Sequence, residues 1–396
     1  MKIVHVISNF SLSYGGMATA CKEIAEGQAK LGEDVTVVTS NLDYPIGVLK
    51  KPFSKTLYEN GVCIYYCPVF FKPLVFSLKL LKCLQQEISN ADLVHVHGLF
   101  RFPQTFSCWY SRQIGKPYIV SPHGCLDPAV NNNKERYFRR HMYQMIFEKK
   151  NLNNAVKVHF TALEEKNLAQ NLIPANKGFI IPNGINTGEY NKLPSEGFFE
   201  NRYNVDANSY KMLFLGRITW KKGLDILLPA LKIIKEKIPN IILLIVGPDN
   251  EGYKNKLLKV IEKLNISQYI KFIGLLDKDD VKKAYVDSDI FVLPSYSENF
   301  GLTIIESMAC GCPVIISNNV NIHEDISSEN LGYVINCKPN EIAESVIDYY
   351  NKSAIYKENH KKRIRSYVLS KYDWDQCIAI FMDTYKEILE KYNNNK

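Results

Sequence analysis

Two glutamates flank a short glycine turn in the second half of the chain and form its strongest chemical signal. Glu298 follows Pro294, where an apolar strand is predicted to end, and Glu306 lies within the helix predicted to begin near Gly301. At such a helix start, the backbone N–H groups of residues 300–302 can surround an anion. The Glu306 carboxylate can accept hydrogen bonds from two neighbouring ribose hydroxyls. The alternative for Glu306 is a half-buried helix carboxylate bonded to the backbone.

Two cations stand in the first loop of the second half. Arg217 follows Gly216 directly after an apolar strand, and Lys222 precedes Gly223. A guanidinium binds a pyrophosphate through its planar fork, and an ammonium binds it as a point charge. Together they could stabilise a leaving nucleoside diphosphate without a metal ion. The alternative is a pair of solvated surface charges.

In the first half, two His-Gly pairs end predicted strands. These are His97-Gly98 and His123-Gly124, and we expect both to point into a cleft between two domains. His123 could donate a hydrogen bond to a sugar hydroxyl or assist proton transfer. A structural role is the alternative for both histidines, and we favour it for His97. The chain contains no ligand spacing typical of a metal site, so none is predicted.

A glycine pair, Gly15 and Gly16, lies between the first predicted strand and the first predicted helix. Such a pair lets backbone N–H groups approach an anion at a helix N-terminus, and the alternative is a plain tight turn. The loop does not match G-x-G-x-x-G, and the chain contains no G-x-x-x-x-G-K-[ST]. A nicotinamide-dependent oxidoreductase and a P-loop hydrolase are therefore disfavoured.

Short apolar runs that alternate with helical patterns position these residues. Strands are predicted at residues 3–7, 34–39, 61–67, 93–97, 118–121, 156–161, 179–182, 211–216, 241–247, 270–274, 289–294 and 313–317, and helices at residues 18–31, 74–87, 105–114, 134–150, 224–237, 251–264, 278–287, 302–310 and 374–392. This alternation is typical of a parallel sheet covered on both faces. Residues 188–208 are rich in Asn, Gly, Pro and Glu and predict a linker.

We therefore predict two doubly wound, Rossmann-like α/β domains that face each other across a cleft, over residues 1–190 and 191–373. A helix over residues 374–396 is expected to cross back to the first domain.

Composition and charge limit the function classes. The chain has 396 residues, of which 46% are apolar and 23% charged, as in an ordinary globular protein of about two domains. The net charge of +8 is uneven, because residues 1–190 hold 21 basic and 14 acidic residues and the remainder hold 28 and 27. The first half is therefore expected to face an anionic partner, but not nucleic acid, and the alternative is a solvated basic face without a partner. Ten scattered cysteines without a C-x-x-C pair indicate a reduced, cytoplasmic protein.

The combination of motifs resembles the nucleotide-sugar glycosyltransferases of the GT-B fold, in particular family 4 of the retaining enzymes (glycosyl transferases group 1). The resemblance covers nearly the whole chain and rests on Gly15-Gly16, His123-Gly124, the run from Pro182 to Ile185, the run from Gly216 to Gly223, Glu298-x7-Glu306 and the tail around Trp374. One departure is Pro248, which follows Gly247 where many members carry a second glycine.

The resemblance implies a retaining hexosyltransferase that needs no metal ion, with a nucleoside-diphosphate sugar as co-substrate and UDP favoured over GDP. The residues implied as catalytic are His123, Arg217, Lys222 and Glu298. The residues implied as donor-binding are Gly15, Gly16, Gly216, Gly247, Gly274, Leu275, Asn299, Phe300, Gly301, Leu302 and Glu306. Arg217 and Lys222 would hold the diphosphate, Glu306 the ribose, and the main chain near Gly274 and Leu275 the base. The leaving phosphate oxygen would take the acceptor proton on the same face of the sugar.

The resemblance assigns the acceptor to the first domain, where the positive charge is concentrated. Residues 68–84 intersperse Lys72, Lys79 and Lys82 among apolar residues. Residues 134–150 combine Arg136, Arg139, Arg140, Lys149 and Lys150 with Tyr137, Phe138, Tyr143 and Phe147. Both segments are candidates for docking on an anionic membrane surface. The alternative is that the aromatic residues pack on the sheet and the cations are solvated.

The function expected from these features is sugar transfer to a hydroxyl of a glycan acceptor, which many relatives carry on a lipid, in surface polysaccharide synthesis. The enzyme would be cytoplasmic or peripheral on the cytosolic face of the inner membrane. The alternatives are a sugar-phosphate or glucan synthase of the same fold and a non-catalytic protein that binds nucleotide sugars. The sequence leaves open the transferred sugar, the linkage and the oligomeric state.

Overall fold

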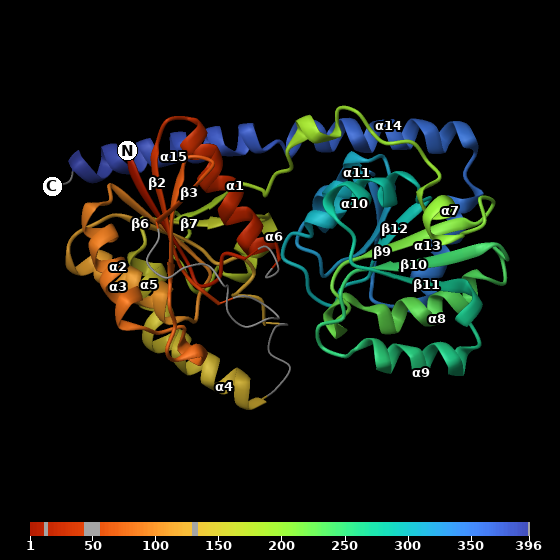
Figure 1. Ribbon diagram of the computed structural model, residues 1–396, viewed down its shortest axis with the longest axis horizontal. Coiled ribbons are helices and arrows are strands. Elements are labelled where there is room, and N and C mark those ends of the chain that lie inside the picture. The colour runs from red at the N-terminus through yellow and green to blue at the C-terminus, as the bar shows by residue number, and fades with distance from the viewer. Residues whose placement is uncertain (12–14, 43–55, 129–133, 395–396) are drawn as a thin grey trace. The chain divides into compact units, whose positions relative to one another are not determined.

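The computed structural model describes residues 1–11, 15–42, 56–128 and 134–394 (Figure 1). The chain divides into two compact units. Unit 1 comprises Met1–Gly184 together with Trp374–Lys396, and unit 2 comprises Ile185–Asp373. Residues 12–14 of the expected glycine loop lie outside the described residues.

Unit 1 contains one eight-stranded sheet in the order β3-β4-β2-β1-β5-β6-β7-β8. Its elements in chain order are β1 (Lys2–Ile7), α1 (Gly16–Lys30), β2 (Asp34–Ser40), β3 (Thr56–Glu59), β4 (Val62–Cys67), the 3-10 turn η2 (Lys72–Leu74), α2 (Leu78–Asn90), β5 (Leu93–His97), α3 (Phe102–Gln113), β6 (Tyr118–Ser121), α4 (Lys134–Tyr143), the π-helical turn η4 (Gln144–Glu148), α5 (Lys149–Asn154), β7 (Lys157–Phe160), α6 (Leu163–Leu168), β8 (Gly178–Ile180) and α15 (Trp374–Asn394). All strand pairs in this sheet are parallel except β3 with β4.

Unit 2 contains a six-stranded, fully parallel sheet in the order β11-β10-β9-β12-β13-β14. Its elements are η5 (Thr187–Tyr190), α7 (Phe198–Tyr203), β9 (Tyr210–Leu215), η6 (Trp220–Lys222), α8 (Leu224–Ile234), β10 (Ile241–Val246), α9 (Lys254–Leu264), η7 (Ser267–Tyr269), β11 (Ile270–Gly274), α10 (Lys278–Val286), β12 (Ile290–Leu293), α11 (Leu302–Ala309), β13 (Val314–Ser317), α12 (His323–Ser328), β14 (Gly332–Ile335), α13 (Pro339–Asn351) and α14 (Ala354–Lys371). The predicted pair of parallel-sheet α/β domains is confirmed.

Both faces of the unit 1 sheet are buried under helices. On one face, Ile3 and Leu93 pack with residues of α1 and with Phe381 and Tyr385 of α15. On the other face, Val4 and its neighbours pack against α2, α3 and α5. Successive residues of one strand thus enter different apolar layers, which explains why these strands are largely apolar instead of alternating with polar residues.

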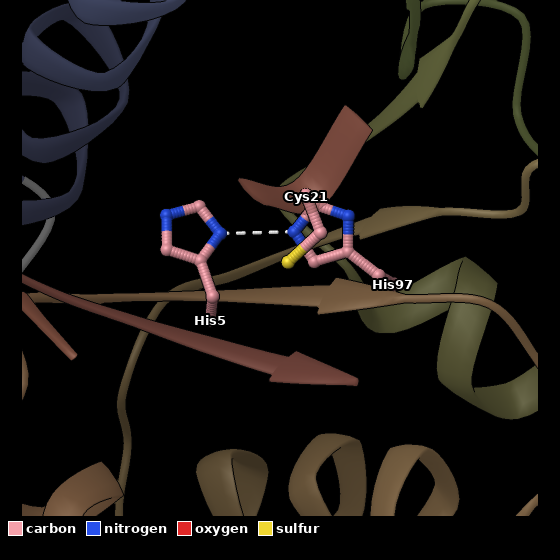
Figure 2. Close-up of side chains that lie close together, drawn as sticks. All are labelled: His5, Cys21 and His97. Carbon is pink, nitrogen blue, oxygen red and sulfur yellow. Dashed lines mark hydrogen bonds between the residues drawn. The ribbon is translucent and has the colours of Figure 1, made fainter. Parts of the chain in front are cut away.

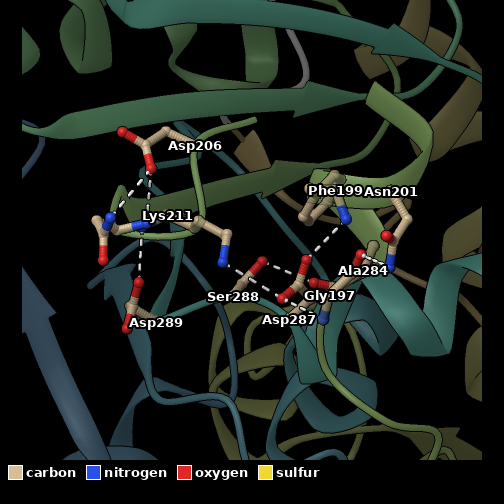
Figure 3. Close-up of polar contacts among 10 residues, drawn as sticks. Gly197, Phe199, Asn201, Asp206, Lys211, Ala284, Asp287, Ser288 and Asp289 are labelled. Atoms are coloured by element: carbon tan, nitrogen blue, oxygen red, sulfur yellow. Dashed lines mark hydrogen bonds and ion pairs between the residues drawn. The ribbon is translucent and has the colours of Figure 1, made fainter. Parts of the chain in front are cut away.

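The segment predicted as a linker is folded into unit 2. The Asp287 carboxylate accepts hydrogen bonds from the backbone N–H of Gly197 at 2.9 Å and of Phe199 at 2.7 Å, and Lys211 Nζ lies 3.3 Å from it (Figure 3). Phe199 is fully buried. Unit 2 begins at Ile185 instead of residue 191, because Ile185 N donates to Tyr372 O at 2.7 Å and Arg365 donates to Tyr190 O.

The helix expected over residues 134–150 is interrupted by the π-helical turn η4. There the buried Glu148 carboxylate accepts hydrogen bonds from Phe100 N at 2.9 Å, Thr105 Oγ1 at 3.1 Å and Asn151 Nδ2 at 3.2 Å. Burial raises the pKa of Glu148, and these donors oppose that rise. The extra residue in the turn brings this carboxylate to its donors inside the unit.

Candidate functional site

The order in which strands are added to the unit 2 sheet reverses between β9 and β12. From β9 the chain adds β10 and β11 on one side, and β12, β13 and β14 lie on the other. In parallel α/β sheets, ligands bind at the carboxyl ends of the strands on either side of such a switch point. The loop after β9 carries Arg217 and Lys222, and the loop after β12 carries Glu298. The fold thus brings both candidate loops to one edge.

These two loops are joined by an ion pair between Lys222 Nζ and the Glu298 carboxylate. Both side chains are about a fifth exposed, at 18% and 20%. Arg217 is exposed and makes no hydrogen bond or ion pair with a residue that the structure describes. One cation of the predicted pair is therefore already held by a carboxylate, and the other projects from the same loop.

Two glycines let the backbones at this edge approach closely. A Cβ on Gly223 would lie 2.0 Å from the carbonyl oxygen of Pro294, and a Cβ on Gly247 would lie 2.0 Å from that of Gly216. Ile218 N also donates to Pro248 O at 2.9 Å. The backbone carbonyl of residue 248, which a glycine would also supply, therefore ties the loop after β10 to the loop after β9.

The predicted contact with a base lies at the next strand end. Gly247 N donates to Gly274 O at 2.8 Å, where the pairing of β10 with β11 shifts register. Gly274 has a φ of 85°, and the neighbouring Leu275 side chain is 78% exposed. Gly216, Gly247, Gly274 and Leu275 are thus brought to one edge of the unit 2 sheet.

The loop before α11 is fixed by backbone hydrogen bonds to the loop after β13. Glu298 N donates to Asn319 O at 3.1 Å, and Asn321 N donates to Glu298 O at 3.0 Å. Asn321 Nδ2 donates to Asn299 Oδ1 at 3.1 Å, so this predicted donor-binding side chain has a structural contact. Gly301, with a φ of 78°, precedes α11 without a side-chain cap.

Helix α11 therefore begins with backbone N–H groups that lack intrahelical partners, as expected for an anion site. Phe300 is buried beneath this turn and Leu302 is half-buried.

Glu306 is half-buried within α11, beyond the turn that follows Glu298. Tyr285 Oη donates to Glu306 Oε2 at 3.3 Å, a contact that the sequence reasoning missed. Burial raises the pKa of Glu306, whereas Tyr285 and Lys278 lower it. The two carboxylates thus have different surroundings, one bonded to a cation and the other to a phenol.

In unit 1, the order in which strands are added to the sheet reverses between β1 and β5. Gly15, with a φ of 92°, precedes α1 after β1, and Gly16 is the first residue of that helix. His97 ends β5 at the same edge. The structure therefore puts the glycine pair and the first His-Gly pair at the switch point of the first sheet.

His97 contradicts the expectation that it points into an open cleft. It is fully buried, and its Nδ1 lies 3.0 Å from Nε2 of the half-buried His123. The reason is that β5 lies in the middle of the sheet, so its last side chain is covered from both sides. Burial lowers the pKa of His123 to about 3 and that of His97 well below its usual value. Both imidazoles are therefore neutral at physiological pH.

Figure 2 shows His5 and His97 facing each other along a hydrogen bond of 2.9 Å, with the Cys21 sulfur beside them. The ligand atoms of these three buried residues lie within 4.8 Å of one another, and two imidazoles with one thiolate would suit Zn²⁺. However, the two facing nitrogens already share a proton, and burial raises the pKa of Cys21, which keeps it a thiol. We therefore interpret the group as a hydrogen-bonded network.

Comparisons with known proteins agree with the two-unit α/β fold. The family model described as Glycosyltransferase Family 4 matches residues 14–189, and the one described as Glycosyl transferases group 1 matches residues 196–367. The chain belongs to the family 4 glycosyltransferases. An uncharacterized glycosyltransferase of Methanocaldococcus jannaschii is 26% identical to it, over 95% of each chain.

Two further proteins resemble this glycosyltransferase along its whole length. The GDP-mannose:cellobiosyl-diphosphopolyprenol alpha-mannosyltransferase of Xanthomonas oryzae is 24% identical over 98% of this chain and 97% of that protein. The solved structure of HepE from Anabaena, in complex with UDP and glucose, superposes with a TM-score of 0.77, covers 98% of this chain and 100% of that one, and is 17% identical. That likeness shows the GT-B fold.

The glycosyltransferase exposes apolar side chains on two segments of unit 1. Residues 70–78 expose Phe70, Phe71, Leu74 and Leu78, and residues 137–147 expose Tyr137, Phe138, Met142, Met145, Ile146 and Phe147. Both segments contact the start of α3, since Arg101 donates to Pro73 O at 2.6 Å and Thr105 bonds to Tyr143 Oη at 2.7 Å. We call these two segments the apolar surface. The Arg136 side chain lies outside the described residues.

Lys149 and Lys150 are exposed at the end of this surface, as are Lys72, Lys79 and Lys82 on the other segment. The alternative in which all the aromatic side chains pack on the sheet is therefore wrong for the apolar surface. Among the described residues, no helix is both long enough and apolar enough to span a bilayer.

Proposed function

We propose that this glycosyltransferase moves a hexosyl group from a nucleoside-diphosphate sugar to a hydroxyl of a glycan acceptor, with retention and without a metal ion. The observation that carries the proposal is the convergence of Arg217, Lys222 and the uncapped start of α11 at one switch point. This edge offers two cations and a helix N-terminus to a diphosphate.

Arg217 and Lys222 bind the diphosphate, and the amides at residues 300–302 add donors to its oxygens. Glu306 binds the ribose hydroxyls, and the backbone at Gly274 and Leu275 meets the base. Glu298, held by Lys222, accepts a hydrogen bond from the transferred sugar. We favour UDP, as in the complexed HepE structure, although the Xanthomonas relative is named for GDP-mannose.

In the proposed step, the bond between the anomeric carbon and the diphosphate oxygen breaks as the acceptor oxygen attacks the same face. The leaving oxygen takes the acceptor proton, so no protein nucleophile or external base is required. The cations stabilise the charge that develops on the diphosphate. For unit 1, we propose that Gly15 and Gly16 contact a substrate phosphate and that His123 contacts a sugar hydroxyl.

A thermal-shift panel of nucleoside diphosphates and their sugars tests the donor class, because a ligand that binds only the native state raises the melting temperature. The best donor is then incubated with candidate acceptors, and the anomeric configuration of the product is read by NMR in the presence of a chelator. An inverted product, or loss of activity with the chelator, would contradict the proposed chemistry. A nucleotide sugar that shifts melting without any transfer would favour the non-catalytic alternative.

For the acceptor, we propose a lipid-linked glycan at the cytosolic surface of an anionic membrane, in surface polysaccharide synthesis. Two observations support it: the apolar surface is flanked by exposed lysines, and the Xanthomonas relative is named for a polyprenol-linked acceptor. Aromatic and aliphatic side chains beside cations are suited to an anionic lipid headgroup region.

A further inference from the structure

Two buried imidazoles, His5 and His97, continue a hydrogen-bonded line that ends at the half-buried His123. Gln28 Oε1 lies 2.8 Å from His5 Nε2, His5 Nδ1 lies 2.9 Å from His97 Nε2, and His97 Nδ1 lies 3.0 Å from His123 Nε2. Gln28 and His5 are fully buried, like His97. The line thus begins at a side-chain amide inside unit 1 and reaches the half-buried histidine after β6.

The proton positions along this line depend on one another. A neutral imidazole has one N–H donor and one bare nitrogen, so each contact between two rings holds one proton. The Gln28 oxygen can only accept, which puts the proton of His5 on Nε2. His5 Nδ1 must then accept from His97 Nε2–H, and His97 Nδ1 must accept from His123 Nε2–H. The remaining nitrogen of His123, Nδ1, is bare.

The charge state needed for this reasoning follows from burial. Desolvation lowers the pKa of His5 to about 4 and that of His123 to about 3, so the imidazoles are neutral near pH 7. The orientation of the Gln28 amide follows from its contact with His5, since Oε1 lies 2.8 Å from His5 Nε2, whereas the amide nitrogen is buried without a hydrogen-bond partner among the described residues.

A second line in the same unit shows how such a network looks when it is complete. Tyr385 Oη lies 2.5 Å from His95 Nδ1, His95 Nε2 lies 2.6 Å from Ser121 Oγ, Ser121 Oγ lies 2.8 Å from His159 Nδ1, and His159 Nε2 lies 2.8 Å from Ile181 O. This line ends on a backbone carbonyl. The first line instead ends at His123 Nδ1, for which the described residues supply no hydrogen-bond partner.

The turn that carries His123 is held in an uncommon conformation. His123 and Gly124 have φ values of 50° and 73°, and Gly124 N donates to the buried Glu165 carboxylate at 2.6 Å. Glu165 is itself fixed by Thr161, whose backbone N–H and hydroxyl both lie 2.8 Å from Oε2. A non-glycine residue in the left-handed region is strained, and such strain is typical of functional sites.

We propose that the line Gln28–His5–His97 holds His123 in its Nε2–H form, so that Nδ1 can only accept a hydrogen bond. His123 then selects a hydroxyl of the substrate sugar and disfavours an anionic oxygen, which offers no proton. Gln28, His5 and His97 are positioning residues that act through His123. This inference rests on the proposed sugar transfer for the identity of the hydroxyl, but the proton positions are independent of it.

The direct test is imidazole NMR of the full-length protein labelled with ¹⁵N-histidine, with signals assigned through His123→Gln. The expected wild-type spectrum shows His123 with a protonated Nε2 and a bare Nδ1 near pH 7. In His97→Leu, which removes the acceptor, His123 is expected to exchange between its two neutral forms. His97→Asn, whose Oδ1 replaces Nδ1, is expected to restore the wild-type form.

Gln28→Met provides a second variant that leaves His97 and His123 in place, in case His97→Leu does not fold. It removes the anchoring acceptor three side chains away and is expected to mix the two forms of His123. The proposal is overturned if His123 carries its proton on Nδ1 or is an imidazolium in the wild type. It is also overturned if Gln28→Met leaves His123 unchanged, or if metal analysis finds a stoichiometric ion that displaces the proton between His5 and His97.

Kinetics test the selectivity separately. His97→Leu is expected to lower kcat/KM about tenfold and His97→Asn to restore most of it, as for loss and replacement of one oriented hydrogen bond. One member of a panel of monodeoxy donor sugars should lose about tenfold with the wild type and much less with His97→Leu. Equal losses for both proteins across the panel would overturn the hydroxyl selectivity. If no nucleotide sugar binds the wild type, the proposed function fails while the NMR result still decides the proton positions.

Discussion

Lys222 and Glu298 form an ion pair between two loops that are 76 residues apart in the sequence. Their strands, β9 and β12, are neighbours in the sheet and lie on either side of its switch point. The pair therefore joins the proposed diphosphate-binding cation to the carboxylate proposed to contact the sugar. It also holds the Lys222 ammonium in place before a ligand arrives.

Removal of either cation should abolish most of the activity. Lys222→Ala or Arg217→Ala is expected to lower kcat/KM by about 100-fold or more, because charge on the leaving diphosphate loses a stabilising partner. The melting temperature should change little for Arg217→Ala, which removes an exposed side chain. Lys232→Ala, an exposed lysine on α8, is the matched control and should be near wild type. Near-normal turnover of Arg217→Ala and Lys222→Ala would remove these residues from the site.

The close approach at Gly247 should be intolerant of a single methyl group. In Gly247→Ala the new Cβ would meet Gly216 O, so the two loops must separate and donor affinity should fall together with stability. Gly252→Ala is the matched control, since Gly252 also has a positive φ, of 69°, but a Cβ added there would meet nothing within 4 Å. It should lose only about 1–2 kcal/mol of unfolding free energy from the left-handed conformation. Equal destabilisation in both variants, measured by urea unfolding, would show that the contact between the two loops does not add to the destabilisation caused by Gly247→Ala.

Glu306 should act mainly on donor binding. Glu306→Ala is expected to raise the donor KM by about tenfold or more with a smaller change in kcat, because the ribose does not react. Burial raises the pKa of this carboxyl, so the wild-type KM should begin to rise at a higher pH than for an ordinary glutamate as the solution is acidified. Glu262→Ala on the exposed side of α9 serves as the control. A fall in kcat at unchanged KM would instead assign Glu306 to the chemical step.

Unit 1 should lose stability as the pH falls below about 6.5. The pKa values of His5 and His159 are lowered to about 4 and that of His123 to about 3, while the unfolded chain titrates near 6.5. Between these values the unfolded state binds more protons, so the free energy of unfolding decreases by up to about 1.4 kcal/mol per pH unit for each such histidine. Melting temperatures measured from about pH 7 to about pH 5 should therefore fall steeply.

Two variants separate this effect from general acid sensitivity. His159→Gln should flatten the profile, because one buried imidazole no longer resists protonation. His141→Gln replaces an exposed histidine and should leave the profile as it is. A wild-type melting temperature that is constant over this range would contradict the neutral state of the network.

The apolar surface should bind anionic vesicles in a salt-dependent way. Full-length Lys149→Glu/Lys150→Glu is expected to lower the vesicle partition constant by about tenfold or more, since each cation near such a surface contributes about 1 kcal/mol. Phe138→Ser/Ile146→Ser should weaken binding at all salt concentrations. Ile355→Ser is the control, because Ile355 is a similarly exposed apolar residue in unit 2. Binding that ignores both charge and salt would contradict the electrostatic part of the proposal.

The alternation of apolar strands and helices was sufficient to predict both sheets, because strands such as β10 and β12 are covered on both faces and are continuous apolar runs in the sequence. The antiparallel strand β3 was missed, although Asn60-Gly61, with φ values of 48° and 83°, is a hairpin signal. Strand β14 was also missed, although Tyr333, Val334 and Ile335 form a short apolar run after Gly332. Ser353, whose hydroxyl accepts a hydrogen bond from Tyr356 N, was an available signal for the start of α14.

The candidate site also contains some residues that could be predicted from the sequence and others that could not. Residues of the βα loops in unit 2 could be predicted, since cations, carboxylates and glycines after predicted strands indicate an anion-binding site. The strand order then brings these loops together. The hydrogen-bonded line of histidines could not be predicted, because His5 and His97 lie in strands whose other residues are mostly apolar and indicate a buried core. Only the parallel register of β1 with β5 aligns His5 beside His95 and brings these rings within reach. Glu165, which fixes the turn after His123, lies in α6, an element absent from the prediction.

Helix α15 gives unit 1 a discontinuous chain, with all of unit 2 inserted before its last helix. The buried contacts of Trp374, Phe381 and Tyr385 complete one face of the first sheet. During synthesis on the ribosome, the part of that face which α15 covers therefore stays exposed beside α1 while the whole of unit 2 is made and emerges. Unit 2 is able to fold first although it is encoded later, and the final step of folding is the closure of the unit whose strands were made at the start.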